Sequence, residues 1–418
     1  MNEKEVRTQS NLYNAATSKS IGFFAIRNSA VNWQRIFHLC DTGRAIDIMD
    51  APKKRRAPVI ITGSGPSFDE QVETLKKWKG DIICHFSQAV TLMYHGIEPT
   101  YIVCLDAVCN WEALSSIDWS KTQTTLITHP GVWPSLIENW PNKILLFREG
   151  AGSFTRDTQK VMYTRLETTL EEALQNKFKM TPLVRTEVTM FACTPPMQLF
   201  AAHIMEYGNV FVVGLDFCYK DNRMRMTDYS LVDGHWEKHE HFLPDPENPR
   251  VTTGTGFKTD PQHLYYKKNF ISACRLSMQD VFITNTGAVA NNEIPYIDLE
   301  YVIERKGKCP NIRPSVRRQQ YDLYLASVGC FCIEYKAGFS FVESVSPVAE
   351  ITEYIKASNR KYICTTCQTN TVSPDDGDHT GDKCPMCGHP TIARQNYADL
   401  DRNIVRVKQL LEAVNADI

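Results

Sequence analysis

Four cysteines near the C-terminal end have the spacing of metal ligands. They form two CxxC pairs, Cys364 with Cys367 and Cys384 with Cys387, and sixteen residues (368–383) separate the pairs. Two such pairs at this spacing are typical of a zinc ribbon, in which four thiolates close a tetrahedron around the ion. A closed tetrahedron has no open position, so we expect a structural zinc that stabilises a segment with little core of its own. Whether the ribbon would contact nucleic acid, contact protein or only brace the fold stays open.

A glycine-containing loop follows an apolar run at residues 58–62. It consists of Gly63, Ser64, Gly65, Pro66 and Ser67. Glycines let a backbone approach a ligand closely and aim its N–H groups at an anion, and a following helix adds the dipole of its N-terminus. We therefore expect the loop to bind the phosphates of a nucleotide. Ser67 also has a local interpretation, because with the glutamate three residues later it can form a capping box.

Two aspartates follow predicted strands. Asp106 comes after the apolar run at 101–105, and Asp216 comes after the run at 210–214. Carboxylates at the carboxyl ends of parallel strands lie where such sheets bind ligands, so each could orient a hydroxyl or hold a cation. Each could also cap the segment that follows it.

The chain after Asp216 is rich in groups that could move protons or neutralise a phosphate. These groups are Tyr219, Arg223, Arg225, His235, His239 and His241, with His263 further along. We expect one of the four histidines to be a general base, although a histidine in such a connection is commonly an exposed bystander. An arginine here could neutralise a leaving phosphate.

Short apolar runs alternate with helical patterns from residue 58 onward. The predicted strands are 58–62, 81–86, 101–105, 124–128, 143–147, 210–214 and 281–284, and the predicted helices are 67–79, 88–95, 155–178 and 195–207. This alternation predicts a Rossmann-like α/β fold, with a mostly parallel sheet and helices on both faces.

The same patterns divide the chain into four segments. We expect a helical lead-in at 1–56, a nucleotide-binding catalytic domain at 57–305, a connecting region at 306–350, and a zinc ribbon with an amphipathic helix at 351–418. The lead-in ends in a basic run, Lys53-Lys54-Arg55-Arg56. Such a run is commonly a solvated linker, and a phosphate-contacting patch is the alternative.

Composition sets broad limits. The chain has 418 residues, 43% of them hydrophobic, and its 46 basic against 48 acidic residues give a net charge of −2. These values argue against wholesale disorder and against nucleic-acid binding through bulk positive charge. No apolar run approaches the roughly 20 residues of a membrane span, and the first residues lack the apolar core of a signal peptide. We therefore expect a cytoplasmic protein whose 14 cysteines are reduced thiols or metal ligands.

Four motifs together resemble the MptE-like family, which includes the motility accessory factor glycosyltransferases. They are PVIITGSGPSFDE, HGIEPTYIVCLD, GNVFVVGLDFCY and ITNTGAVANNEIPYI, in an order and spacing similar to the family's. The resemblance spans about residues 30–305. It implies one of two chemistries: transfer of a sugar from a CMP-type donor, or synthesis of a pterin diphosphate from ATP with magnesium.

The sugar-transfer branch implies that the loop 63–67 holds the nucleotide and that a tyrosine directly after the Gly-x-Asp-Phe strand end binds the donor phosphate. We expect Asp216, the aspartate of that strand end, to be catalytic and to orient donor or acceptor. Here Cys218 separates the motif from Tyr219. The diphosphokinase branch uses two aspartates of one short run to hold magnesium. The corresponding run of this chain has only Asp106, so Asp216 would have to be the second ligand. We expect a glycosyltransferase-like enzyme with a nucleotide-activated donor. The acceptor (glycan, protein or nucleic acid) and the oligomeric state stay open. A non-catalytic module for nucleotide binding or for assembly with a partner is a third class.

Overall fold

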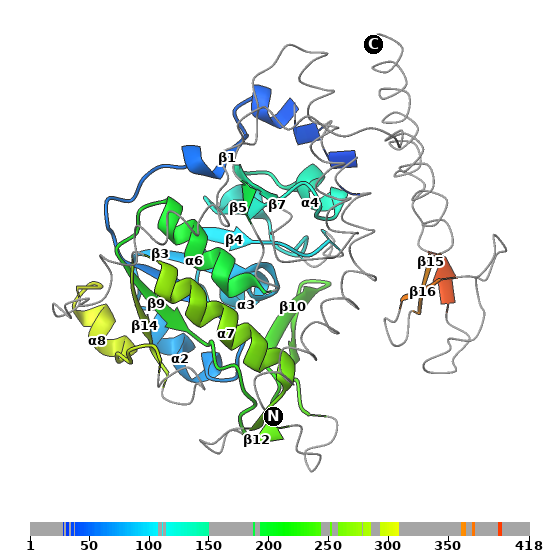
Figure 1. Cartoon of the computed structure of the whole chain (residues 1–418). Coiled ribbons are helices and arrows are strands. Elements are labelled where there is room, and N and C mark those ends of the chain that lie inside the picture. The colour runs from blue at the N-terminus through cyan, green and yellow to red at the C-terminus, as the bar shows by residue number, and fades with distance from the viewer. Residues whose placement is uncertain are drawn as a thin grey trace, which may run out of the picture.

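The computed structural model centres on one parallel sheet (Figure 1). It describes residues 28, 31–32, 35–36, 38–107, 111, 114–149, 187–188, 193–243, 251–252, 258–277, 279–285, 293–308, 361–364, 370–372 and 392–394. Eight strands form the sheet, and every neighbouring pair is parallel. In spatial order they are β1 (Ala45–Asp47), β6 (Ile144–Leu146), β5 (Thr125–Thr128), β4 (Tyr101–Val103), β3 (Asp81–His85), β2 (Val59–Thr62), β9 (Asn209–Val213) and β14 (Asp280–Ile283).

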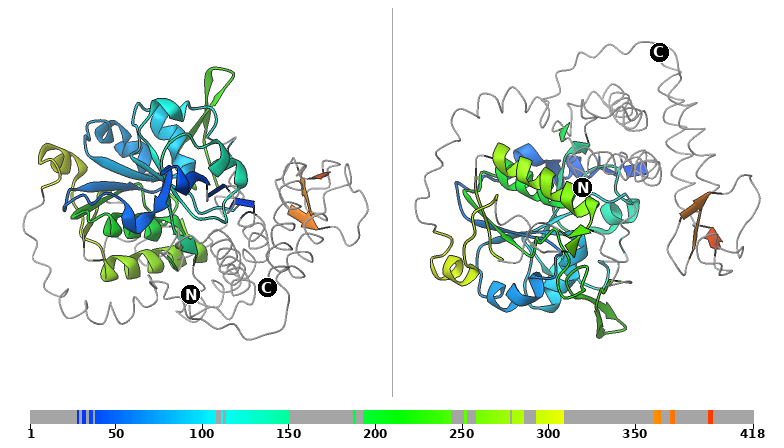
Figure 2. Two further views of the ribbon diagram at one scale, coloured as in Figure 1. Left: turned by 90° about the horizontal axis from the view of Figure 1, so that it is seen from above. Right: turned by 60° about the horizontal axis from the view of Figure 1, so that its bottom comes forward.

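Helices cover both faces of this sheet (Figures 1 and 2). One face carries α6 (Thr194–Ile204) and α7 (Pro261–Leu276), which pack against each other. The other carries α2 (Phe68–Leu75), α3 (Phe86–Tyr94), α4 (Pro134–Asn139) and α8 (Leu299–Glu304). The predicted α/β class is therefore confirmed. Two short 3-10 helices, η1 (Ile48–Asp50) and η3 (Trp119–Lys121), lie between the strands.

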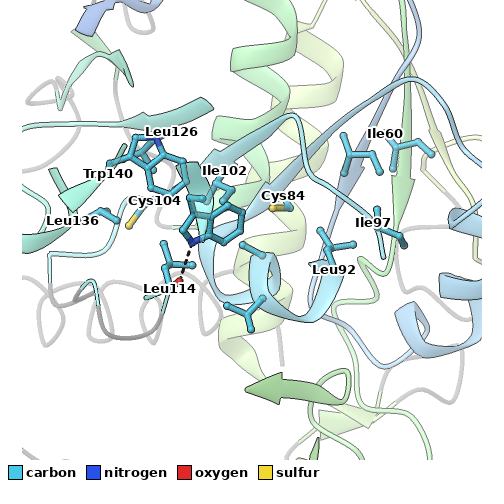
Figure 3. Close-up of a cluster of buried hydrophobic side chains, with 14 of the residues drawn as sticks. Ile60, Cys84, Leu92, Ile97, Ile102, Cys104, Leu114, Leu126, Leu136 and Trp140 are labelled. Atoms are coloured by element: carbon cyan, nitrogen blue, oxygen red, sulfur yellow. Dashed lines mark hydrogen bonds between the residues drawn. The ribbon is translucent and has the colours of Figure 1, made fainter. Parts of the chain in front are cut away.

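Alternation along the strands produces two cores. Ile60 points to the layer of α2 and α3, whereas Val59 and Ile61 point to the layer of α6 and α7. All three side chains are fully buried, which is why the strand reads as a continuous apolar run. Figure 3 shows part of the first core, where Ile60, Ile102 and Leu126 from three different strands lie among helix residues.

Smaller sheets lie outside the main one. The strands β10 (Asp228–Val232) and β11 (His235–His239) form a hairpin. It packs on α3 through the stacked rings of Tyr94 and Tyr229, whose centroids are 3.7 Å apart. The pairs β7 (Arg148–Glu149) with β8 (Glu187–Val188), and β12 (Val251–Thr252) with β13 (Lys258–Thr259), are two residues long. Near the C-terminus, β15 (Lys361–Cys364) lies between β16 (Asn370–Val372) and β17 (Ile392–Arg394) in an antiparallel sheet. The helices expected at 155–178 and beyond residue 394 lie outside the described residues.

Candidate functional site

The strand order reverses at β2. The chain runs from β2 through β3, β4, β5 and β6 in one direction, and then returns to place β9 and β14 on the other side. Parallel sheets bind ligands outside the carboxyl ends of their strands at such a switch point. The register pairs Thr62 with Val213 and Ile61 with Ile83, so the loop after β2 lies between the ends of β9 and β3.

The loop 63–67 packs closely against the end of β9. The amide of Gly63 donates to Val213 O (2.8 Å), and the amide of Gly65 donates to Gly214 O (2.7 Å). A Cβ on Gly63 would lie 2.6 Å from Gly214 O, and one on Gly65 would lie 2.5 Å from Asp216 Oδ2. These glycines therefore make room for the neighbouring strand, and their amides face it. This differs from our expectation that the amides face a phosphate.

Asp216 holds the same loop to the sheet. It is 2% exposed, and it accepts hydrogen bonds from Ser67 N (2.8 Å) and Ser67 Oγ (2.5 Å). It also accepts from Asn285 Nδ2 (2.5 Å), which follows β14. Burial raises the pKa of Asp216, and the donors from Ser67 oppose that shift. Because Ser67 Oγ binds Asp216 and makes no side-chain cap for α2, the alternative capping-box interpretation is wrong.

A second group of polar side chains lies beside this loop. The amide of Met226 donates to Ser64 O (2.9 Å), which brings the start of the hairpin to the switch point. Asp228 Oδ2 accepts from Arg225 Nη2 (2.8 Å) and from His241 Nε2 (2.9 Å). The Nε of Arg225 and the Oδ1 of Asp228 are buried without a hydrogen-bond partner among the described residues. Two polar atoms in this group are thus left for a ligand or water.

His85 joins this group from β3, and the sequence reasoning missed it. Its half-buried ring lies with Nδ1 2.8 Å from Ser87 Oγ. Burial and the charge of Arg225 lower the pKa of His85 to about 4, so the ring is neutral at neutral pH. The available signal was its place next to the end of the predicted strand 81–86.

The structure separates the other candidates. His235 and His239 lie on the exposed strand β11, and His239 Nε2 is 2.8 Å from Ser230 Oγ. Arg223 forms an ion pair with Asp69 of α2 (2.7 Å). Asp106 follows β4 and is half-buried. Of the expected bases, His241 is thus the one that lies in the group beside the loop.

Tyr219 and His263 meet at Asp260, the residue before α7. The Tyr219 hydroxyl and the His263 amide both donate to the Asp260 carboxylate. Burial alone would raise the pKa of Asp260, but its bonds with His263 and Tyr219 outweigh burial and hold that pKa well below its ordinary value. Asp260 is therefore an ionised anchor for the start of α7.

The four predicted zinc ligands fall largely outside the described residues. Cys364 is the last residue of β15, the central strand of the small antiparallel sheet, and the other three cysteines are not described. Within the described ranges there is no group of three or more metal-ligating side chains. The donor set of four thiolates nevertheless fits zinc.

A family model supports the predicted resemblance. The model described as "6-hydroxymethylpterin diphosphokinase MptE-like" matches residues 34–222. The matched segment is less than half of the chain's 418 residues. It carries the first three motifs, the loop 63–67 and Asp216, whereas the fourth motif and His241 lie beyond it. No curated protein matches the sequence.

Three solved structures are similar to the chain at low scores. The MAf glycosyltransferase from Magnetospirillum magneticum AMB-1 has a TM-score of 0.44 and 13% identity, covering 95% of this chain and 54% of that one. The chain thus spans about half the length of that protein. The α-2,3-sialyltransferase Cst-I from Campylobacter jejuni has a TM-score of 0.26 and 13% identity, with coverage of 73% and 96%. The sialyltransferase CstII from the same organism was solved with cytidine-5′-monophosphate. It has a TM-score of 0.26 and 11% identity, covering 73% of this chain and 100% of that one.

Likeness at this level carries no argument about the chain, so the account rests on its own geometry and on the family match. Among the described residues, no helix has both the length and the apolar character needed to cross a membrane.

Proposed function

We propose that the chain is a transferase that moves a glycosyl group from a nucleotide-activated donor. The observation that carries this proposal is the group of Arg225, Asp228, His241 and His85 beside the loop 63–67. It combines a cation, a base held by a carboxylate, and buried polar atoms that have no hydrogen-bond partner in the described part of the chain, all at the switch point of a parallel sheet. Transfer from a phosphate ester to a hydroxyl requires a cation for the leaving phosphate and a base for the hydroxyl proton.

Each side chain has a distinct role in this proposal. Arg225 neutralises the negative charge that grows on the leaving phosphate when the bond to the sugar carbon breaks. His241 removes the proton from the attacking acceptor hydroxyl, and Asp228 fixes its ring and stabilises the imidazolium that forms. His85, whose ring is neutral at neutral pH, forms a hydrogen bond with the nucleotide-activated sugar donor. Asp216 positions the loop 63–67 and does not touch the substrate.

A structural zinc at Cys364, Cys367, Cys384 and Cys387 belongs to the same proposal. Its support is the spacing of the two CxxC pairs, together with the place of Cys364 at the end of a central strand. When bound, the ion would link the two pairs and stabilise the small sheet. The group beside the loop 63–67 does not depend on it.

The description of the matching family favours a second candidate, which is diphosphate transfer from ATP to a hydroxymethyl pterin-like substrate. In that chemistry magnesium would lie between the nucleotide phosphates and carboxylates such as Asp106. Its weakness is that Asp216, the expected second ligand, is occupied by Ser67 and Asn285.

A thermal-shift screen separates the two functions. The full chain is melted with CMP, UDP, GDP, AMP and ATP, each with and without magnesium, because a ligand that binds the folded state raises the melting temperature. We expect stabilisation by one nucleoside monophosphate or diphosphate without magnesium. Stabilisation by ATP alone, and only with magnesium, would favour the diphosphokinase. No stabilisation by any nucleotide would contradict both and leave a non-catalytic module.

A further inference from the structure

Two basic runs, far apart in the sequence, meet at the edge of the sheet opposite the candidate site. The first, Lys53-Lys54-Arg55-Arg56, comes shortly before β2, and the second, Arg305-Lys306-Gly307-Lys308, follows α8. The amino ends of the parallel strands lie at this edge. The runs are therefore on the side of the sheet away from the loop 63–67.

Hydrogen bonds hold both runs to residues 206–209, where β9 begins. Arg56 N donates to Glu206 O (2.7 Å), and Asn209 Nδ2 donates to Gly307 O (3.0 Å), so both runs are bonded to the short connection before β9. A Cβ on Gly307 would lie 2.4 Å from Pro58 Cβ, so the second run packs against the residue two positions after the first run. The cations of both runs thus belong to one surface.

The backbone at this surface is strained where its cations are. Arg55 and Arg56 have φ values of +48° and +66°, and the amide of Ala57 donates to Lys54 O (2.9 Å) to close the turn. Turns with two left-handed central residues strongly favour Asn-Gly, because side chains with a Cβ are disfavoured there. Lys306 also has a left-handed φ, +52°. Strain of this kind persists at sites where the side chains are needed.

Four cations of this surface are available for a partner. Arg55, Arg56, Lys306 and Lys308 are exposed, and none of them forms an ion pair within the part of the chain that the structure describes. Their neighbours are occupied. Lys54 pairs with Asp81 (3.0 Å), and Lys53 Nζ donates to two backbone carbonyl oxygens.

We propose that Arg55, Arg56, Lys306 and Lys308, here named the basic edge, bind the phosphodiester backbone of a nucleic acid. Guanidinium groups match phosphate oxygens in a two-point geometry, and closely spaced cations suit a polymer with a charge on every residue. A lipid surface is a poorer fit, since peripheral membrane binding also needs exposed apolar side chains. Trp78, which lies 3.2 Å from the Cβ position of Gly307, is only 8% exposed. This inference does not rest on the proposed transferase activity.

The turn itself supplies a sharp test. Replacing Arg55→Asn and Arg56→Gly together removes two cations and installs the sequence that this turn favours. We expect the double variant to melt above the wild type, which excludes misfolding as the cause of any loss. We also expect its affinity for a fluorescein-labelled 20-nucleotide single-stranded DNA to fall at least ~10-fold at 50 mM salt. The slope of log affinity against log salt should drop by ~1.4, because each lost phosphate contact contributes about 0.7.

A control variant removes two cations elsewhere. Arg35→Asn with Lys238→Asn has the same net charge as the double variant, and both residues already pair with glutamates. Its DNA affinity should stay near the wild-type value. Lys306→Asn should weaken binding as the turn variant does. Stabilisation by the nucleotide found in the screen should be unchanged in all three, which separates this site from the proposed active site.

Several results would overturn the proposal. One is a wild-type protein that does not bind the DNA at 50 mM salt, and another is an Arg55→Asn, Arg56→Gly variant that binds it as the wild type does. Equal losses in the control variant would show that net charge alone decides. Equally tight binding to heparin or to phosphatidylserine vesicles at the same salt would show a surface for any polyanion and not a nucleic-acid site.

Discussion

The lowered pKa of His85 makes the stability of the fold depend on pH. Its pKa of about 4 lies below the ordinary value of 6.5, so between these values the unfolded chain binds more protons than the folded protein. Stability should therefore fall as the pH drops from 6.5 toward 4. In the wild type, this effect should lower the unfolding free energy by on the order of 1–3 kcal/mol between pH 6.5 and 4. We expect the His85→Gln variant not to show this decrease. Urea unfolding at pH 6.5, 5 and 4 measures it.

His235→Gln is the matched control, because His235 lies on the exposed hairpin. Its unfolding curves should follow those of the wild type at each pH. A His85→Gln variant with the same pH dependence as the wild type would contradict the assignment of a half-buried, neutral imidazole at the end of β3.

Residue chemistry was partly predictable from the sequence. Arg225 and His241 were among the candidates because basic and imidazole groups cluster after Asp216. Asp228 and His85 were not, since a lone carboxylate or histidine is a weak signal until the fold brings it to a partner. His85 and Arg225 are distant in the sequence and meet only because β3 ends beside the hairpin. The role of Asp216 also needed the structure, which shows its oxygens bonded to Ser67 and Asn285.

The loop 63–67 behaves as one element with the end of β9. Gly65→Ala places a Cβ 2.5 Å from Asp216 Oδ2 and 2.9 Å from Gly214 O, so the loop must shift. We expect a loss of about 1–3 kcal/mol in unfolding free energy, typical of overpacking. Urea denaturation tests this, with Ser64→Ala as the neutral control in the same loop. If Gly65→Ala unfolds at the wild-type midpoint, the close approach to β9 is wrong.

The zinc prediction concerns the small sheet of β15, β16 and β17. Elemental analysis of the purified chain should find about one zinc per molecule, and Cys364→Ser should lower that content, because zinc holds a closed set of four thiolates. Cys40→Ser, which changes an unpaired cysteine near β1, should keep the metal. Zinc-free wild-type protein with an intact protease-resistant C-terminal segment would contradict the ribbon.

Strands buried on both faces were the most predictable elements. The runs at β2, β3, β5 and β9 are apolar because helices cover both sides, and the predictions match their bounds to within a few residues. The edge strand β1 is three residues long and gives no period to recognise. The hairpin was read as a loop because β11, His235–His239, is exposed along its whole length and carries no apolar stripe.

At the scale of the whole molecule, polar and charged groups gather at two opposite edges of the sheet. Its carboxyl edge gathers the loop 63–67 and the group around Asp228, and its amino edge gathers Arg55, Arg56 and the cations after α8. The sequence predicted the first edge, because glycines and aspartates after apolar runs mark strand ends. For the second edge, the sequence left two interpretations of residues 53–56 open, a solvated linker and a phosphate-contacting patch. Only the fold shows that residues 305–308 lie at the same edge.

The most direct test of the account is the affinity of Arg225→Gln for the nucleotide that the thermal-shift screen identifies, measured by calorimetry. Among the described residues, the Nε of Arg225 is buried and has no hydrogen-bond partner. Hydrogen bonds to charged groups contribute about 1.5–3 kcal/mol. We predict a loss of roughly 10- to 100-fold in affinity, while Arg35→Gln, a residue outside this group that pairs with Glu138 of α4, keeps the wild-type value. Equal affinity in Arg225→Gln and Arg35→Gln would place the nucleotide elsewhere and contradict the proposed site.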